Sequence, residues 1–264
     1  MARRARFGTV APLMFAATAF VAAVVTAVLL SGSGDGSKHA TAGAQLTPRD
    51  PSAASERAVR IALPSVVQIQ SPGKLGSGIV FDGDGDIVTN AHVVAGARSF
   101  TVTTPDGTHH RATLRGTFPA NDLAVIRTTD KALKPARFGE SSNLKVGERA
   151  LAIGNPLGLR SSVTDGIVSA TSRSVSEGNG VTLKSVVQTS AAINPGNSGG
   201  ALIDLTGAVI GIPTLAATDP ELGGSAAPGV GFAISSNTVK KIAGQLVSQG
   251  HVVNLDRLGR ISGN

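Results

Sequence analysis

Three residue types that together carry out acyl transfer lie in three separate segments of the chain. His92 lies in TNAHVV, Asp122 in ANDLAVI and Ser198 in NPGNSGGAL. A serine hydroxyl is a weak nucleophile unless a histidine takes its proton, and a carboxylate must hold that histidine in one tautomer. Each residue alone also fits an ordinary role, as a core histidine, a turn aspartate or a hydroxyl in a glycine loop. The three types occur in the order His, Asp, Ser along the chain, and we take them as a candidate catalytic triad.

Glycines on both sides of Ser198 support the same chemistry. The tetrahedral intermediate of acyl transfer carries an oxyanion, which needs backbone N–H donors aimed into the site. The segment PGNSGG is flexible enough to turn amides inward. We expect an oxyanion hole over Gly196, Asn197 and Ser198, with the amides of Gly196 and Ser198 as donors. Asn197 is neutral, so it cannot form an activating ion pair with a newly cut N-terminus.

The segment that precedes the histidine, FDGDGDIVTNAHVV at Phe81–Val94, has aspartates on alternate positions and invites a calcium hypothesis. A calcium loop between two helices needs a glycine at its sixth position and a bidentate glutamate at its twelfth. Ile87 and Val93 stand there instead. Asp-Gly pairs supply the positive φ of tight turns, so the segment predicts a β-hairpin that places His92 just after its second strand.

Short runs rich in Val, Ile and Thr, separated by turn residues, predict an all-β protein for most of the chain. One helix is predicted near the end of the chain, with Ser236 or Asn237 as its N-cap, Gly250 as its C-cap and an apolar face of Val239, Ile242, Leu246 and Val247. Trp, Tyr and Cys are absent and only 8 residues are Phe, so aromatic platforms for nucleic-acid bases and thiolate chemistry are excluded. Three of the charges behind the net +7 are Arg3, Arg4 and Arg6, and the others are scattered. We expect no nucleic-acid partner, no metal and no cofactor.

The N-terminus predicts export. Residues 10–30 read VAPLMFAATAFVAAVVTAVLL, and about 30 Å of helix at this length is enough to cross a bilayer. We expect a retained signal anchor, single-pass, with the arginines cytoplasmic and the rest outside. The alternative is a signal peptide cleaved near Ala40–Ala42, which would give a secreted protein. The expected organisation is a basic stub and transmembrane helix at 1–30, a flexible linker at 31–51, a catalytic domain at 52–250 and a tail at 251–264.

Several motifs together resemble the HtrA (Deg) family of trypsin-like serine proteases. They are GSGIVFDGDGDIVTNAHVVAGA, NDLAVI, AIGNPLGL, QTSAAINPGNSGGALID and GVGFAISSNTVKKI, and the resemblance covers about residues 55–250. It implies a chymotrypsin/trypsin-like double β-barrel with a C-terminal helix, the site between the barrels and the triad His92, Asp122 and Ser198. It also implies an endopeptidase of the cell envelope that cuts misfolded or specific exported proteins after small aliphatic residues.

The resemblance further implies a substrate pocket without a carboxylate at its base, so basic side chains should not fit. The expected lining is Ala191, Ala192, Ile193, Asn194, Ile212, Thr214, Leu215 and Val230. Thr214 is expected to hydrogen-bond Asp122. Pro213 stands where the family often has Asn, in the strand expected to pair with substrate, and its missing N–H should alter that pairing.

The sequence departs from the pattern of this family in two respects, and it leaves two alternative functions. The chain ends at Asn264, so we expect no PDZ domain, and it has few aromatic residues near its catalytic domain's start, so a homotrimer stays uncertain. A membrane-tethered chaperone or binding module with a dormant site is the first alternative to a working protease. An α/β-hydrolase esterase is the second, because Gly196, Ser198 and Gly200 fit its nucleophile motif, yet ALIDLTGAVIGI alternates like strands where that fold needs a helix.

Overall fold

The computed structural model describes residues 51–155, 162–176, 182–194, 196–219 and 225–253. The expected transmembrane segment, nearly all of the linker and most of the expected tail lie outside these ranges. Within them, no helix is both long enough and apolar enough to span a membrane. The linker boundary shifts by one residue, because Pro51 already belongs to the first helix.

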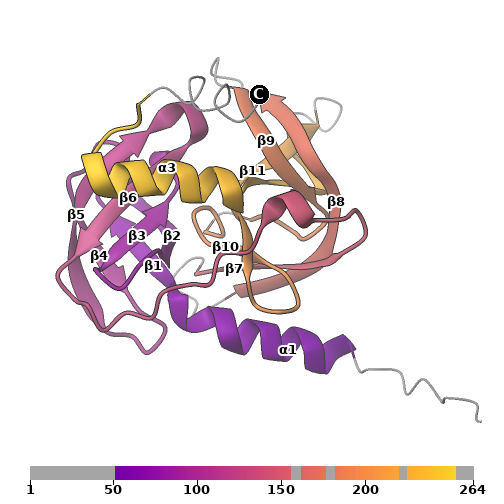
Figure 1. The fold of residues 1–264 in the computed structure, drawn as a ribbon, viewed down its shortest axis with the longest axis horizontal. Coiled ribbons are helices and arrows are strands. Elements are labelled where there is room, and N and C mark those ends of the chain that lie inside the picture. Colours follow the sequence, from indigo (N-terminus) through magenta and orange to yellow (C-terminus); the bar gives the residue numbers. More distant parts are fainter. Residues whose placement is uncertain (1–50, 156–161, 177–181, 195, 220–224, 254–264) are drawn as a thin grey trace, which may run out of the picture. The chain divides into compact units, whose positions relative to one another are not determined.

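The first half of the described chain closes into a six-stranded antiparallel barrel (Figure 1) in the order β1-β2-β3-β6-β5-β4. Its strands are β1 Val66–Ser71, β2 Lys74–Val80, β3 Asp86–Thr89, β4 Ser99–Thr103, β5 His109–Phe118 and β6 Leu123–Thr128. Aliphatic side chains with one phenylalanine fill its interior, among them Ile69, Ile87, Phe100, Val102 and Ile126. The all-β prediction is confirmed.

The second half forms another closed barrel, in the order β10-β11-β12-β9-β8-β7. Its strands are β7 Arg149–Gly154, β8 Ser162–Ser176, β9 Thr182–Thr189, β10 Ala201–Ile203, β11 Val209–Asp219 and β12 Ser225–Ser235. Read in the opposite direction, this order is that of the first barrel shifted by six strands. The two halves therefore share one topology although their sequences show no visible repeat.

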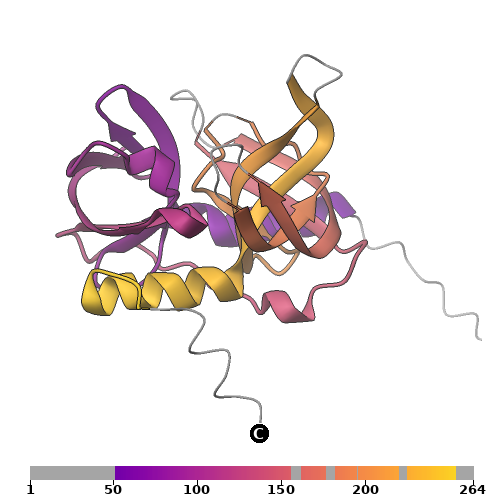
Figure 2. The same cartoon turned by 90° about the horizontal axis from the view of Figure 1, so that it is seen from above.

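Two helices flank the barrels: α1 at Pro51–Ala62 and α3 at Ser236–Gln249 (Figure 2). The predicted apolar face of α3 is confirmed, because Val239, Ile242 and Leu246 are fully buried. Gly250 ends α3 at φ 74°, and its N–H donates to the carbonyl of Leu246. Such a left-handed C-cap is the usual role of glycine after a helix.

The predicted N-cap of α3, Ser236 or Asn237, is wrong by one or two residues, because Ser235 holds that position. Strand β12 runs directly into the helix, so the backbone turns one residue earlier. Ser236 and Asn237 are used in packing instead: the hydroxyl of Ser236 donates to the carbonyl of Gly139, and the N–H of Asn237 donates to the hydroxyl of Ser141.

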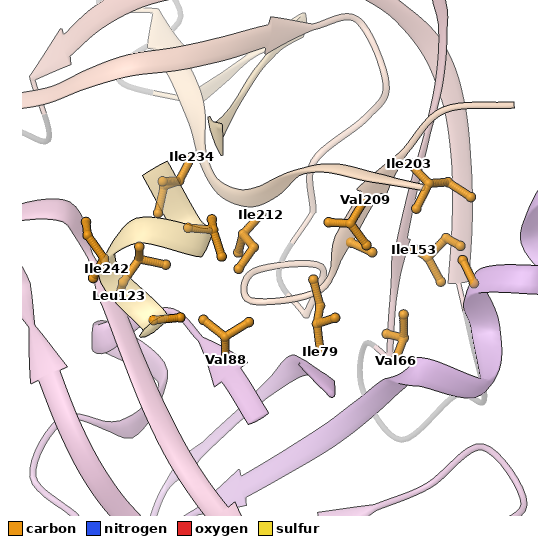
Figure 3. Close-up of a cluster of buried hydrophobic side chains, with 14 of the residues drawn as sticks. Val66, Ile79, Val88, Leu123, Ile153, Ile203, Val209, Ile212, Ile234 and Ile242 are labelled. Carbon is orange, nitrogen blue, oxygen red and sulfur yellow. The ribbon is translucent and has the colours of Figure 1, made fainter. Parts of the chain in front are cut away.

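One apolar core joins the two barrels and both helices (Figure 3). Successive side chains of a strand point to opposite faces, so β3 sends Ile87 into the first barrel and Val88 out toward the second. Ile79 and Leu123 face the same way as Val88. The second barrel contributes residues that include Ile153, Ile203, Val209, Ile212 and Ile234 to the same core. This shared core fixes the barrels against each other and leaves the site at their junction.

The aspartate-rich segment is the predicted hairpin between β2 and β3, with Ile79 opposite Val88. The carboxylate of Asp82 accepts the N–H groups of Asp84 and Asp86, at 2.9 and 3.2 Å. Gly85 adopts φ 87°, which a non-glycine residue rarely does. The Asp82 carboxylate therefore stabilises the tight turn of the hairpin.

Asp86 is fully buried and forms a two-pronged ion pair with Arg127 of β6. The hydrogen bonds that Arg127 donates to this carboxylate raise the pKa of Arg127 above its usual value. Arg115 contributes a second positive charge, at 4.0 Å from Asp86. The ion pair thus ties the hairpin that leads to His92 to the neighbouring strand β6.

Arg127→Met should lower the free energy of unfolding by about 3 to 5 kcal/mol, because it leaves the buried Asp86 carboxylate without its main partner. Urea unfolding of the variant measures this. Arg111→Met is the control, since Arg111 is an exposed residue of β5 for which the described structure shows no ion pair. Equal stability of the two variants would contradict the assignment.

Candidate active site

His92 is held by Asp122 through two contacts. It lies in the short helix α2, Ala91–Val94, just after β3, as the sequence predicted. Its Nδ1 is 2.8 Å from Asp122 Oδ2, and its backbone N–H donates to Asp122 Oδ1 at 3.0 Å. The side chain of Asp122 is 6% exposed and that of His92 is 51% exposed. One ring edge is therefore fixed while the rest of the imidazole stays open to solvent.

Asp122 adopts a left-handed backbone conformation, φ 48°, directly after a single turn of 3-10 helix, η2 Pro119–Asn121. Outside glycine this conformation is uncommon, and Asn and Asp tolerate it best. Two donors from the histidine segment stabilise it, because the carbonyl of Asp122 accepts the N–H of Ala91 and the side-chain amide of Asn90. Asn90 was not predicted, although its place two residues before His92 was a usable signal.

Thr214 approaches Asp122 from the second barrel. Its hydroxyl donates to Asp122 Oδ2 at 2.5 Å, the contact that the sequence predicted. The pairing of β11 with β12 is irregular between Pro213 and Leu215, so Thr214 occupies a bulge. A bulge re-aims a side chain out of the regular alternation, which explains how this residue reaches across the junction. The carboxylate is thus bound from both barrels.

Ser198 lies in a loop of glycines at the same junction. Gly196 and Gly199 have φ values of 100° and 80°, and a Cβ on Gly199 would fall 2.2 Å from the carbonyl oxygen of Ser77. The hydroxyl of Ser198 lies 3.5 Å from the carbonyl of Thr214, and the described structure shows no hydrogen bond from it to His92. Catalytic contacts are often loose without substrate, so this spacing is compatible with the chemistry.

The amides of the loop divide into free and bound ones. Those of Gly196 and Ser198 donate to no other described residue, as an oxyanion hole requires. The amide of Asn197 donates to the carbonyl of Asn194 at 2.9 Å, and its side chain is fully buried. Including Asn197 in the oxyanion hole is therefore a correction: its N–H is used within the loop.

The predicted pocket residues do not all gather in one place. Ala191 and Ile193 are largely buried, and Ile193 packs against Gly231 of β12, where an added Cβ would come within 2.5 Å of it. Ala192 and Asn194 are exposed, and Val230 is half-buried beside a separate cluster formed by Leu183, Val186 and Phe232. The side chain of Leu215 lies outside the described set.

Ile212 was predicted to line the pocket, and this prediction is wrong. Its side chain is fully buried in the core shared by the two barrels. Two positions later along β11, Thr214 would point the same way in a regular strand, and only the bulge separates the two. The hydroxyl of Thr214 donates to Asp122, so this side chain stabilises that carboxylate.

The carbonyl of Pro213 faces the Ser198 loop. It accepts the N–H of Gly199 at 3.0 Å, and within an extended strand the N and C=O of one residue lie on the same side. The nitrogen of Pro213 therefore lies on the strand edge beside the Ser198 loop, where no neighbouring strand requires an N–H donor. Proline is tolerated at such an edge.

Residues 76–212 match the family described as "Trypsin-like peptidase domain", and this is the class of protein that the fold and the site define. "Serine protease Do-like HtrA" of Bacillus subtilis is 45% identical over 185 residues, which are 67% of this chain and 40% of that protein. The "Probable periplasmic serine endoprotease DegP-like" of Chlamydia trachomatis is 42% identical over 177 residues, which cover 67% of this chain and 34% of that protein. The chain thus spans less than half the length of these relatives.

Solved structures of similar proteases match the fold of this chain. The "HtrA-type protease AlgW with tripeptide" gives a TM-score of 0.67 at 38% identity, covering 75% of this chain and 64% of that one. The "serine endoprotease from Yersinia pestis" gives a TM-score of 0.63 at 34% identity, and the match covers 75% of this chain and 68% of that one. The chain belongs to the HtrA (Deg) family of trypsin-like serine proteases.

Thr214→Val should lower kcat/KM for peptide cleavage by about ten- to a hundredfold, because a hydrogen bond to a charged group contributes about 1.5 to 3 kcal/mol. Thr214→Ser keeps the hydroxyl and should stay near the wild type. Steady-state cleavage of a fluorogenic peptide compares the three chains. Equal losses in both variants would mean that packing around residue 214, and not its hydroxyl, matters.

Proposed function

We propose that the chain is a serine endopeptidase that hydrolyses unfolded or specific exported proteins through an acyl-enzyme. The observation that carries the proposal is the double attachment of Asp122, which binds His92 through Nδ1 and is itself bound by Thr214 of the other barrel. An imidazole fixed at Nδ1 presents Nε2 as the free nitrogen, which is the atom that must take the serine proton.

The proposed reaction uses three side chains and two amides. His92 takes the proton of Ser198 as its Oγ bonds to the substrate carbonyl carbon, and the amides of Gly196 and Ser198 bind the oxyanion. When the peptide C–N bond breaks, His92 gives that proton to the leaving amine. Water, deprotonated by His92, then attacks the acyl-enzyme and releases Ser198. Asp122 keeps the imidazole in one tautomer throughout.

The expected cut sites follow small aliphatic residues. Ala191 and Ile193 offer an apolar wall, and Ile193 narrows the space beside Gly231. No carboxylate occurs between Ala191 and Asn194, so a basic side chain would find no counter-charge. Val, Ala and Leu fit such a wall.

A location in the cell envelope, outside the cytoplasm, is part of the proposal. Residues 1–30 would form a signal anchor and residues 31–51 a tether for the catalytic domain at 52–250. Its support is the apolar run at 10–30 and the printed description of the Chlamydia trachomatis relative as periplasmic. Polypeptide substrates and the membrane are the proposed partners.

A second candidate function, a gated protease-fold binding or chaperone module, is favoured by one observation. The Ser198 hydroxyl is directed at the Thr214 carbonyl at 3.5 Å and forms no described bond with His92. A partner that turns this hydroxyl toward His92 would then act as the activator.

The full chain in mild detergent should cleave casein, and Ser198→Ala should abolish the cleavage, because the variant lacks the nucleophile. Mass spectrometry of the fragments should place the cuts after Val, Ala or Leu. Circular dichroism of both chains is the control for folding. A folded wild type that does not cut casein would favour the gated module.

Ile193→Ala should widen the pocket and shift the cuts toward larger residues such as Met and Phe, because the removed side chain fills the space beside Gly231. The same fragment mapping measures the shift. Val146→Ala also shortens an aliphatic side chain, at an exposed position outside the predicted pocket, and should leave the preference unchanged. An unaltered preference in Ile193→Ala would place the pocket elsewhere.

A further inference from the structure

Ser77 of β2 is a fully buried serine that takes part in four hydrogen bonds. Its N–H donates to the carbonyl of Ser198 at 3.0 Å, and its hydroxyl donates to the carbonyl of Gly196 at 2.6 Å. The hydroxyl accepts the N–H of Asn155 at 2.8 Å, and the carbonyl of Ser77 accepts the hydroxyl of Thr89 at 2.6 Å. Ser77 belongs to the first barrel, whereas Gly196, Ser198 and Asn155 belong to the second half of the chain.

The two carbonyls that Ser77 binds belong to the two residues whose amides are free. The carbonyl of Gly196 lies in the peptide plane that joins Gly196 to Asn197, and the N–H of that same plane donates to Asn194. This plane is therefore held at both ends. The carbonyl of Ser198 fixes the plane that joins Ser198 to Gly199. The N–H of Ser198 lies in the plane between these two, so its direction is set from both sides.

The direction of the Ser77 hydroxyl is itself determined. A hydroxyl has one hydrogen to donate, and the N–H of Asn155 occupies an acceptor position on its oxygen. The hydrogen is thereby left for the carbonyl of Gly196. The loop also packs closely against β2, because a Cβ on Gly199 would be 2.2 Å from the Ser77 carbonyl oxygen and 2.4 Å from the Thr89 hydroxyl.

We propose that Ser77 is a positioning residue for the oxyanion hole, which holds the amides of Gly196 and Ser198 in the direction that binds the tetrahedral intermediate. The inference rests on the proposed proteolytic function and adds to it. Ser77 touches no reacting atom. It acts through the loop, and its effect should fall on the transition state more than on substrate binding.

The test compares Ser77→Ala with Ser236→Ala. Ser236 is a matched control, because it is also fully buried and its hydroxyl also donates to a glycine carbonyl, that of Gly139, at 2.9 Å. Both variants lose a hydrogen bond from a hydroxyl to a glycine carbonyl. Ser77→Ala also removes the acceptor of the Asn155 N–H, so its midpoint of thermal unfolding should fall more than that of Ser236→Ala. Only Ser77→Ala should lose activity.

The expected loss is about ten- to a hundredfold in kcat for a fluorogenic peptide, with KM changed less than about threefold, since a misplaced donor costs somewhat less than a deleted one. The inhibition constant of a peptide boronic acid ending in valine should rise by the same factor. Boron bound to Ser198 is tetrahedral and places an oxygen where the oxyanion forms, so the boronate reports on the hole directly.

Two outcomes would overturn the inference and are distinguishable. If Ser77→Ala keeps its kcat within about twofold of the wild type while Ser198→Ala is inactive, Ser77 has no positioning role and the proposed function stands. If the wild type neither cleaves the peptide nor binds the boronate, both fail. Should Ser77→Ala not fold, Ser77→Cys keeps a weaker donor at this position, and its kcat must then fall without a rise in KM.

Discussion

The buried carboxylate of Asp122 is the interaction on which the arrangement of the site depends. A charge at 6% exposure must be bound by donors on several sides, and here the donors come from different parts of the fold. His92 and its backbone N–H approach from the first barrel, and Thr214 approaches from the second. The apolar core between the barrels keeps these donors within reach of one carboxylate. Separation of the barrels would leave the charge buried and only partly bound.

Much of this could be predicted from the sequence, for physical reasons. His92, Asp122 and Ser198 each follow or precede a strand-like run, and their types and order indicated one chemistry. The hairpin before His92 followed from the conformational freedom of glycine beside aspartate, and the C-terminal helix followed from its apolar spacing and its terminal glycine. The contact between Thr214 and Asp122 followed from the family resemblance and not from local pattern.

The remaining features depend on contacts between distant segments, which a local pattern does not encode. Ile212 and Thr214 are two positions apart, and only a bulge gives one to the core and the other to the site. Asn197 was placed in the oxyanion hole because its neighbours belong there, yet a turn of the loop uses its amide internally. Ser77 reads as an ordinary residue of a glycine-rich strand until its hydroxyl is seen to reach Gly196, 119 residues away.

The sharing of the site between two barrels has a consequence for the order of events during folding. Each barrel closes through pairings of strands distant in sequence, which makes folding slow relative to helical proteins. A nascent chain that has closed only its first barrel holds His92 and Asp122, but Thr214 lies 92 residues beyond Asp122. Such an intermediate has a base without a nucleophile. Under the proposed proteolytic function, the chain therefore acquires the means to cut other polypeptides only after its second barrel has closed.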